Sequence, residues 1–156
     1  MAEPERKIVC SNRRARYEYH IEETLEAGLV LVGSEVKALR AGKANLKDAY
    51  ARVQKNGIYL MKAHVGAYEP ASRQNHEPER DRKLLLNRRE IDRLRGKVRE
   101  RGFTLIPLDI YFRDGRAKLT LALARGKRHY DKRAAIAKRE TDRQLRRVVK
   151  RRQQGR

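Results

Sequence analysis

The feature that most constrains this chain is a C-terminal segment with too little apolar content to form a core. Residues 126–156 contain thirteen Lys and Arg against three Asp and Glu, which is half of the chain's net charge of +20. Leu145, Val148 and Val149 are the main large apolar residues of this segment. Such a composition buries too little apolar surface to fold alone. We therefore expect a basic tail at 126–156, disordered when free, attached to one folded domain at 1–125.

The charge of the tail indicates the kind of partner. A dense positive segment binds a polyanion by displacing its condensed counterions, and RNA or DNA fits this description better than a small substrate. About 125 residues are enough for one domain with a modest core. The longest apolar run, Leu29–Val32, is far shorter than the roughly 20 residues needed to cross a bilayer. The sequence therefore predicts a cytoplasmic protein without a membrane partner.

The folded part has mostly strand patterns. Tyr17, Tyr19 and Ile21 alternate with polar residues, which predicts a strand, and the run 29–32 predicts a second strand buried on both faces. Residues 35–40 are good helix formers, preceded by a candidate N-cap at Ser34 and followed by Gly42 as a C-terminal cap. The sequence thus predicts two strands and then a short helix.

Two hairpins are predicted from turn dipeptides. Asn56-Gly57 and Asp114-Gly115 each separate two strand-like runs, and both dipeptides favour the positive φ angles of a type I′ turn. In the last run, the leucines of 119–123 alternate onto one face, which leaves Lys118 on the outer face. Pro107 cannot donate to a strand ladder, so we expect an edge or a bulge there.

One longer helix lies between the hairpins. Ile91, Leu94 and Val98 have amphipathic helical spacing, and we expect this helix to begin after a capping residue at Asn87 and end before Gly102. Six or so antiparallel strands with one substantial helix indicate a mainly β fold with helices. The expected architecture is a small antiparallel β-barrel related to the oligonucleotide-binding (OB) fold.

The sequence offers little catalytic chemistry. The four histidines are widely spaced, the single cysteine excludes an internal disulfide, and Gly126-Lys127 lacks the remaining residues of a phosphate-binding loop. We therefore expect neither an enzyme nor a bound metal or cofactor. One acidic residue, Glu26, has two possible roles: it accepts hydrogen bonds from RNA, or it forms an intramolecular salt bridge, which composition alone favours.

Several strings of the sequence, in order along the chain, resemble the SsrA-binding protein family, also called small protein B. The resemblance extends from about residue 8 into the tail. The strings are Asn12-Arg13-Arg14-Ala15-Arg16-Tyr17-Glu18-Tyr19, Glu26-Ala27-Gly28-Leu29, Gly33-Ser34-Glu35-Val36-Lys37-Ala38-Leu39-Arg40, Arg82-Lys83-Leu84-Leu85-Leu86-Asn87 and Gly126-Lys127-Arg128-His129-Tyr130-Asp131-Lys132-Arg133.

This resemblance implies a non-enzymatic RNA-binding factor of trans-translation. Such a protein binds the tRNA-like domain of transfer-messenger RNA, occupies the space of the missing anticodon arm and helps deliver the RNA to ribosomes stalled without a stop codon. Its tail becomes helical in the empty mRNA channel of the small subunit. Alanyl-tRNA synthetase and elongation factor Tu act on the same RNA. Composition alone also permits a general ribosomal or nucleoid-associated nucleic-acid binder.

The resemblance also implies which residues meet RNA. The residues expected to bind transfer-messenger RNA are Glu26, Leu85, Lys118, Arg13, Arg14, Lys37, Arg40 and Lys83. The tail residues expected near the decoding centre of the ribosome are Gly126, Lys127, Tyr130, Asp131, Lys132 and Arg133. Without the resemblance, Leu85 would be assigned to core packing, whereas the pattern of the last hairpin already predicts an outward-facing Lys118.

Overall fold

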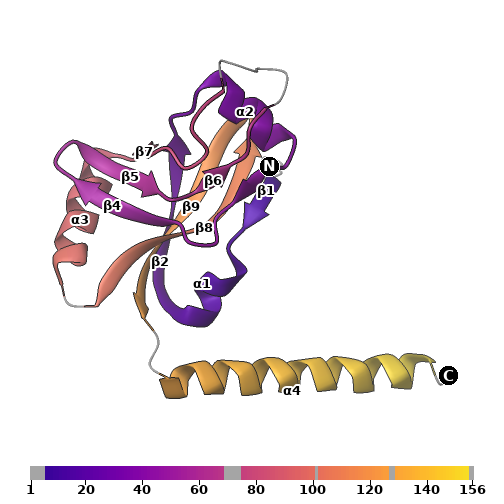
Figure 1. Cartoon of the computed structure of the whole chain (residues 1–156). Helices are drawn as coiled ribbons and strands as arrows, with labels where there is room; N and C mark the ends of the chain where they lie inside the picture. The colour runs from indigo at the N-terminus through magenta and orange to yellow at the C-terminus, as the bar shows by residue number, and fades with distance from the viewer. Residues whose placement is uncertain (1–5, 69–74, 101, 127–128, 155–156) are drawn as a thin grey trace.

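The computed structural model describes residues 6–68, 75–100, 102–126 and 129–154 (Figure 1). Strands dominate the chain up to residue 126, and one long helix follows them. In chain order the elements are β1 (Lys7–Ser11), α1 (Arg13–Glu18), β2 (Tyr19–Leu29), α2 (Gly33–Arg40), β3 (Ala44–Asn45), β4 (Tyr50–Gln54), β5 (Gly57–Met61), β6 (His64–Val65), β7 (Arg82–Leu85), α3 (Arg88–Arg99), β8 (Phe103–Arg113), β9 (Arg116–Gly126) and α4 (His129–Gln154).

The main sheet closes on itself. Its strands follow the order β1-β8-β4-β5-β7-β2-β9, and β9 also pairs with β8, so that β8, β4, β5, β7, β2 and β9 form a ring of antiparallel strands. The strand β1 extends this ring along the upper part of β8, while β3 and β6 form a separate pair. The predicted mainly β, antiparallel architecture is therefore confirmed, and ring closure leaves few strand edges unpaired.

Both predicted hairpins are present, but their turns differ. The turn between β8 and β9 pairs Arg113 with Arg116, and Asp114 and Gly115 have positive φ angles of 51° and 74°, as a type I′ turn requires. The turn between β4 and β5 pairs Gln54 with Gly57, so its two central residues are 55 and 56. The prediction of a type I′ turn centred on Asn56-Gly57 is therefore wrong, although the predicted hairpin is present.

The first predicted strand, at 17–21, is only partly right. Residues 19–21 lie in β2, which runs from 19 to 29, but Tyr17 belongs to the helix α1 at 13–18. Asn12 holds α1 on β8: its backbone N–H donates to the Leu108 carbonyl and its side chain donates to the Pro107 carbonyl. Ala15 of α1 packs against a small outer cluster with Ala122 and Ala124. These tertiary contacts override the local alternation of Tyr17, Tyr19 and Ile21.

The second predicted strand is also incorrect. Beyond Leu29, Val30 keeps one backbone hydrogen bond to Lys83, but Val30 and Val32 are 43% and 45% exposed rather than buried. The strand gives way to α2, whose N-cap is Val32 instead of Ser34. Glu35 provides the cap because its carboxylate accepts a hydrogen bond from the Val32 N–H.

The helix α3 matches its predicted position. Asn87 is its N-cap residue, although its side chain makes no capping hydrogen bond, and Gly102 beyond its end has a φ of +85°. Leu94 is fully buried, and Ile91 and Val98 pack against the core, as their spacing predicts. Pro107 lies at a bulge in β8, where the register against β9 shifts.

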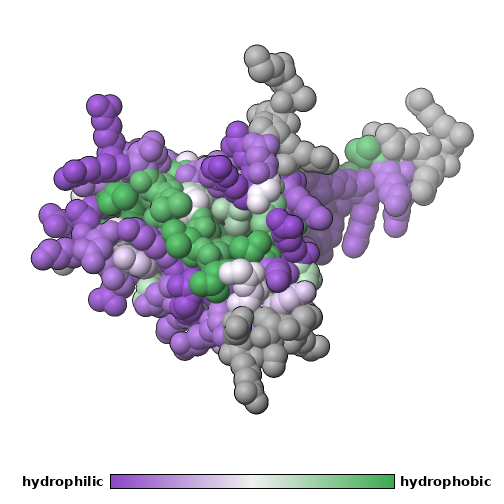
Figure 2. All heavy atoms as spheres, turned by 90° about the horizontal axis from the view of Figure 1, so that it is seen from above, coloured by the Kyte–Doolittle hydropathy of each residue, from purple (hydrophilic) through white to green (hydrophobic). Residues whose placement is uncertain are grey.

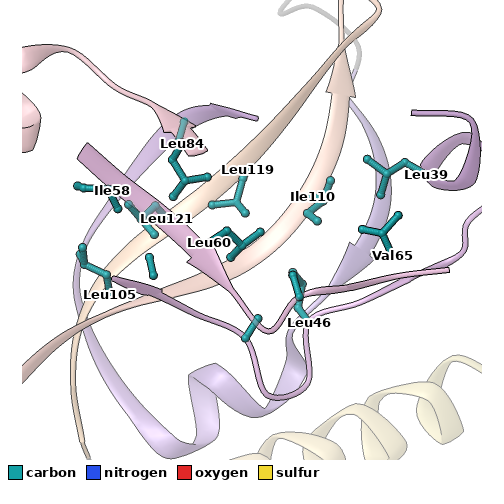
Figure 3. Close-up of a cluster of buried hydrophobic side chains, with 14 of the residues drawn as sticks. Leu39, Leu46, Ile58, Leu60, Val65, Leu84, Leu105, Ile110, Leu119 and Leu121 are labelled. Atoms are coloured by element: carbon teal, nitrogen blue, oxygen red, sulfur yellow. The ribbon is translucent and has the colours of Figure 1, made fainter. Parts of the chain in front are cut away.

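The core fills the inside of the ring (Figure 3). Ile58, Leu84, Leu119 and Leu121 come from three different strands, β5, β7 and β9, and are at most 1% exposed. Leu39 of α2 and Val65 of β6 join the same cluster, so α2 covers one end of the ring. The predicted inward face of β9 is confirmed, because Leu119, Leu121 and Leu123 are all buried.

Most of the tail forms the single helix α4, which extends away from the ring in Figure 1. The prediction of a tail that is disordered in the free chain is therefore not confirmed. The segment is rich in Arg and Lys and also contains Ala and Gln, all of which are strong helix formers, so its local propensity is compatible with a helix. Strand β9 extends to Gly126, so the first residue of the predicted tail is the last residue of the ring.

Candidate nucleic-acid interface

A row of paired residues crosses the outer face of the ring. Leu85 of β7 is opposite Gly28 of β2, Gly28 is opposite Lys118 of β9, and Lys118 is opposite Tyr111 of β8. Residues paired directly across antiparallel strands lie on the same face of a sheet. The structure therefore brings Leu85 and Lys118 onto one surface, although they are far apart in the sequence.

Gly28 shapes this row because it has no side chain. A Cβ atom at position 28 would lie 3.1 Å from the Leu85 Cβ, closer than side chains normally approach. The Leu85 side chain, which is 55% exposed, can therefore lie close over β2. Core packing of Leu85 is excluded by this exposure. Lys83, two residues earlier on the same strand, is also exposed on this face.

Exposed apolar side chains contribute to the surface of the molecule. Figure 2 shows a hydrophobic area seen from above and bordered by hydrophilic side chains. The exposed large apolar residues of the ring and its connections are Ile8, Val30, Val32 and Leu85. Exposed apolar groups bordered by cations suit a nucleic acid, which offers both base faces and phosphates.

Glu26 lies on the same face of β2, two residues before Gly28. The Tyr111 hydroxyl donates a hydrogen bond to Glu26 Oε2, and Arg113 Nη1 lies 3.1 Å from Oε2 and 3.2 Å from Oε1. The Glu26 side chain is still 32% exposed. Glu26, Arg113 and Lys118 line one shallow recess with Asp114 and Arg116. The intramolecular salt bridge considered from the sequence is thus present, and it leaves part of the carboxylate accessible.

The surroundings of Glu26 keep it ionised. The hydrogen bond from Tyr111 is the main cause that lowers the pKa of Glu26; partial burial opposes it, and Arg113 and Lys118 reinforce it. Burial, together with the hydrogen bond to Glu26, raises the pKa of Tyr111 to about 12. Near neutral pH, Tyr111 is therefore a donor and Glu26 an acceptor.

The helix α2 carries Lys37 and Arg40. The Lys37 ammonium lies 5.4 Å from the centre of the Tyr68 ring, and the Arg40 guanidinium 5.7 Å from the centre of the Phe112 ring. Both cations are exposed. Arg40 also borders an apolar recess between the end of α2, β1 and the turn of the last hairpin. Cations over aromatic rings are held in place while remaining accessible to phosphates.

A buried ion pair holds α2 on the ring. Glu35 is fully buried and accepts hydrogen bonds from Arg82 Nε and, at 2.6 Å, from Arg80 Nη2. Arg82, 1% exposed, also donates to the carbonyls of Ala63 at 2.8 Å and Pro78 at 3.1 Å. Burial alone would raise the pKa of Glu35, but the hydrogen bonds and the Arg82 charge lower it. Because Glu35 and Arg82 are hydrogen-bonded to each other and to neighbouring groups, the pair fixes the position of α2.

Arg13 and Arg14 lie elsewhere. Both are exposed on α1, at the opposite end of the ring from α2 (Figure 1). The residues expected to bind RNA thus separate into two groups: one on the outer face and α2, the other on α1. Together these groups extend along the length of the ring.

The tail residues are only partly described. Gly126 ends β9, and Lys127 lies outside the described residues. Tyr130, Asp131, Lys132 and Arg133 belong to the first turns of α4. Among the residues that the structure describes, no cluster of three or more potential metal ligands occurs, and no helix has the length and hydrophobicity to cross a membrane.

Sequence reasoning missed the roles of Tyr111 and Arg113. The position of Tyr111 beside Lys118 could have been predicted, because the Asp114-Gly115 turn fixes the register that pairs these two residues. The contact between Tyr111 and Glu26 could not be predicted from the turn, because it depends on β9 pairing with β2 as well as with β8. The buried pair of Glu35 and Arg82 was missed for the same reason.

Comparisons with known proteins show the family to which the chain is similar. The family model described as SmpB protein matches residues 9–151. The SsrA-binding protein of Desulforudis audaxviator (strain MP104C) is 59% identical over 150 residues, which cover 96% of this chain and 98% of that protein. The SsrA-binding protein of Syntrophomonas wolfei subsp. wolfei (strain DSM 2245B / Goettingen) is 58% identical over 146 residues, or 94% and 93% of the two chains.

A solved structure is also similar. It is described as "tmRNA-SmpB: a journey to the center of the bacterial ribosome", and it matches with a TM-score of 0.65 and 48% sequence identity. The match covers 81% of this chain and 93% of that chain.

Proposed function

The chain belongs to the SmpB family of SsrA-binding proteins, and on this basis we propose which activity the ring of strands supplies and which activity α4 supplies. It is a non-enzymatic RNA-binding protein that acts with transfer-messenger RNA on the ribosome, in trans-translation. The protein itself supplies recognition, and the ribosome supplies the chemistry. It uses no cofactor in this role.

The ring of strands binds the tRNA-like domain of transfer-messenger RNA. The observation that carries this assignment is the cross-strand row in which Leu85 and Lys118 flank Gly28, with Glu26 beside it. Leu85 offers an apolar contact to a base or sugar, Lys118 neutralises a phosphate, and Glu26 accepts hydrogen bonds from a base or a ribose hydroxyl. The antiparallel ring is related to the OB fold, in which one barrel face commonly binds nucleic acid.

The other cations extend the contact with RNA. Lys83 lies on the same face, while Lys37 and Arg40 are presented by α2, which the Glu35 ion pair fixes. Arg13 and Arg14 of α1 bind phosphates farther along the ring. These positions supply the sequence-independent part of the affinity, which depends strongly on salt.

The tail engages the ribosome. With the ring occupying the space of the missing anticodon arm, Gly126, Lys127, Tyr130, Asp131, Lys132 and Arg133 lie near the decoding centre of the small subunit. The Tyr130 ring stacks on a ribosomal RNA base. The remainder of α4 occupies the empty mRNA channel, and its helix is only marginally stable before it meets RNA, because isolated helices without a packing face are marginal in water.

The same RNA brings further partners in the cytoplasm. Alanyl-tRNA synthetase charges transfer-messenger RNA, and elongation factor Tu with GTP carries the charged RNA to the ribosome. Both reach this protein through the RNA that it binds. No membrane takes part in this sequence of events.

A titration at physiological salt tests the proposal. The full-length protein is mixed with transfer-messenger RNA, bulk tRNA and random RNA of the same length, and the three affinities are compared. A large preference for transfer-messenger RNA is expected, because the row on the outer face recognises a folded RNA. Equal affinities would show instead a general ribosomal or nucleoid-associated binder, whose affinity comes from the net charge of +20 alone.

A further inference from the structure

Tyr111 is buried beneath the outer face of the ring and is not one of the residues proposed to contact RNA. Its side chain is only 2% exposed, although it points to the same face as its partner Lys118. The Arg6 guanidinium lies over its ring, 5.1 Å from the centre. The ring is thus covered, and the hydroxyl is directed toward the carboxylate of Glu26.

The carboxylate of Glu26 is held from one side. Tyr111 donates to Oε2, and Arg113 Nη1 lies within 3.2 Å of both oxygens. A glutamate on an exposed strand otherwise samples several side-chain conformations, and fixing it on binding costs conformational entropy. An ionised carboxylate has about four positions that accept hydrogen bonds. Two donors leave positions open on a side chain that is 32% exposed.

We propose that Tyr111 is a positioning residue for RNA recognition: its hydroxyl orients the Glu26 carboxylate so that the open acceptor positions meet a hydrogen-bond donor of the RNA beside Lys118. This inference rests on the proposed function, since it assigns a task to a residue behind the proposed contact. The RNA group is a base N–H or a ribose hydroxyl, which share the donor chemistry that a carboxylate recognises. Because the carboxylate is already oriented, binding loses less entropy.

The substitution Tyr111→Phe isolates this role. It removes one hydroxyl and keeps the ring that packs under Arg6, so the buried apolar area of the ring is preserved. Arg113 still pairs with Glu26, while Thr120, which also hydrogen-bonds the Tyr111 hydroxyl, loses that partner. The thermal midpoint of the full-length variant is measured first, to establish that it is folded.

A double-mutant cycle tests the proposal. The affinities of full-length wild type, Tyr111→Phe, Glu26→Ala and the double variant are measured against an RNA that comprises the tRNA-like domain. We expect Tyr111→Phe to bind about three- to tenfold more weakly, because the Glu26 carboxylate must then be ordered on binding. In the Glu26→Ala background, the same substitution should have no further effect, because no carboxylate remains to be oriented.

Two further readouts separate positioning from a general structural effect. Tyr111→Phe changes no charge, so the salt dependence of binding should keep its slope. In the free protein, nuclear magnetic resonance of the side-chain carboxyl should show a higher pKa for Glu26, since its main lowering cause is lost while Arg113 and Lys118 remain. The control Tyr50→Phe, which removes a hydroxyl from β4, should alter neither the pKa of Glu26 nor the affinity.

The outcomes distinguish this inference from the proposed function. If Tyr111→Phe binds like wild type while Glu26→Ala binds weakly, Tyr111 does not position Glu26, and the RNA contact of Glu26 stands. Additive effects in the double variant would also overturn the inference, because Tyr111 would then act independently. If Glu26→Ala binds like wild type, Glu26 contacts no RNA, and both this inference and that part of the proposed function are wrong.

Discussion

The ring of strands and the helix α4 obtain their structure from different sources. In the ring, side chains such as Ile58 and Leu119 are completely buried, and the buried charged pair of Arg82 with Glu35 of α2 is held by hydrogen bonds. On α4, the apolar residues Leu145 and Val148 remain 58% and 48% exposed. The ring is specified by its own packing, whereas α4 relies on local propensity and leaves its surface to a partner.

Because the ring and α4 differ in this way, removal of α4 should have the largest effect. A chain that ends at Gly126 keeps all of β9 and should retain most of its specific affinity for transfer-messenger RNA. It should support no tagging on stalled ribosomes, because the part that engages the mRNA channel is absent. Gel-shift titrations and a tagging reaction in vitro measure the two activities. In full-length protein, alanine at 130–133 should impair tagging similarly.

Two results would contradict the assignment of RNA recognition to the ring and of ribosome binding to α4. Full tagging by the truncated chain would mean that α4 is dispensable on the ribosome. Loss of its preference for transfer-messenger RNA over other RNAs would mean that the ring alone does not provide recognition. A truncated chain with an unchanged thermal midpoint serves as the control for folding, since α4 contributes little to the core.

Breaking the buried pair should affect the ring and spare α4. Arg82→Ala removes the buried cation that pairs with Glu35 and leaves Arg80 and the Val32 N–H as its partners, which should cost up to about 3–5 kcal/mol of the free energy of unfolding. Denaturation in urea, followed by circular dichroism, measures this loss. The matched control is Arg93→Ala, because the pair of Arg93 with Glu23 is 48% and 34% exposed and should cost less than about 1 kcal/mol. Equal losses would show that burial does not govern the contribution of the pair.

The same pair should give the ring an acid sensitivity. The pKa of Glu35 is lowered in the folded state, so the stabilisation is fully present above its unfolded value, about 4.3, and is lost as pH falls through the folded value. Urea midpoints measured between neutral pH and the acid range should fall less steeply for Glu35→Gln than for wild type. Parallel curves would contradict this assignment.

The marginal stability of α4 can be measured directly. A peptide of residues 129–154 should show little helix by circular dichroism in buffer and gain helix when a polyanionic RNA is added. The physical reason is that its many cations repel one another until phosphates neutralise them. A peptide that is fully helical in buffer would show that local propensity alone suffices, and that the tail is preformed before it meets the ribosome.

The smallest effect is expected at a single phosphate contact. Lys118→Ala should weaken binding to the tRNA-like domain several-fold and lower the slope of log affinity against log salt by about one. Lys55→Ala, in the turn between β4 and β5, removes the same charge from an exposed site outside the proposed interface and should leave the slope unchanged. A common slope for both variants would place Lys118 outside the RNA contact.

Features that depend on local chemistry were predictable from the sequence. The Asp114-Gly115 turn and the alternating leucines that follow it fixed the last hairpin and the outward direction of Lys118. The sequence was misleading where distant contacts decide. Residues 13–18 form a helix because Asn12 and Ala15 dock on β8 and β9, and the local alternation gave no indication of this.

The candidate site was only partly predictable. Glu26 and Lys118 could be proposed individually from the resemblance and the strand pattern. Their shared recess depends on β2 and β9 lying side by side, and the contact with Tyr111 joins residues 85 positions apart. Such nonlocal pairing is set by the closed topology as a whole.

The pairing of β9 with β2 has a consequence for the time at which the protein becomes active. Tyr19 is the partner of Gly126, so the ring stays open until almost all of its residues have been synthesised. A nascent chain that stops before β9 has neither a closed core nor Lys118, and it exposes the unpaired edges of β2 and β8. A chain that lacks β9 therefore cannot bind RNA as the complete protein does. Recognition is gained in one late step, after the last strand has left the ribosome.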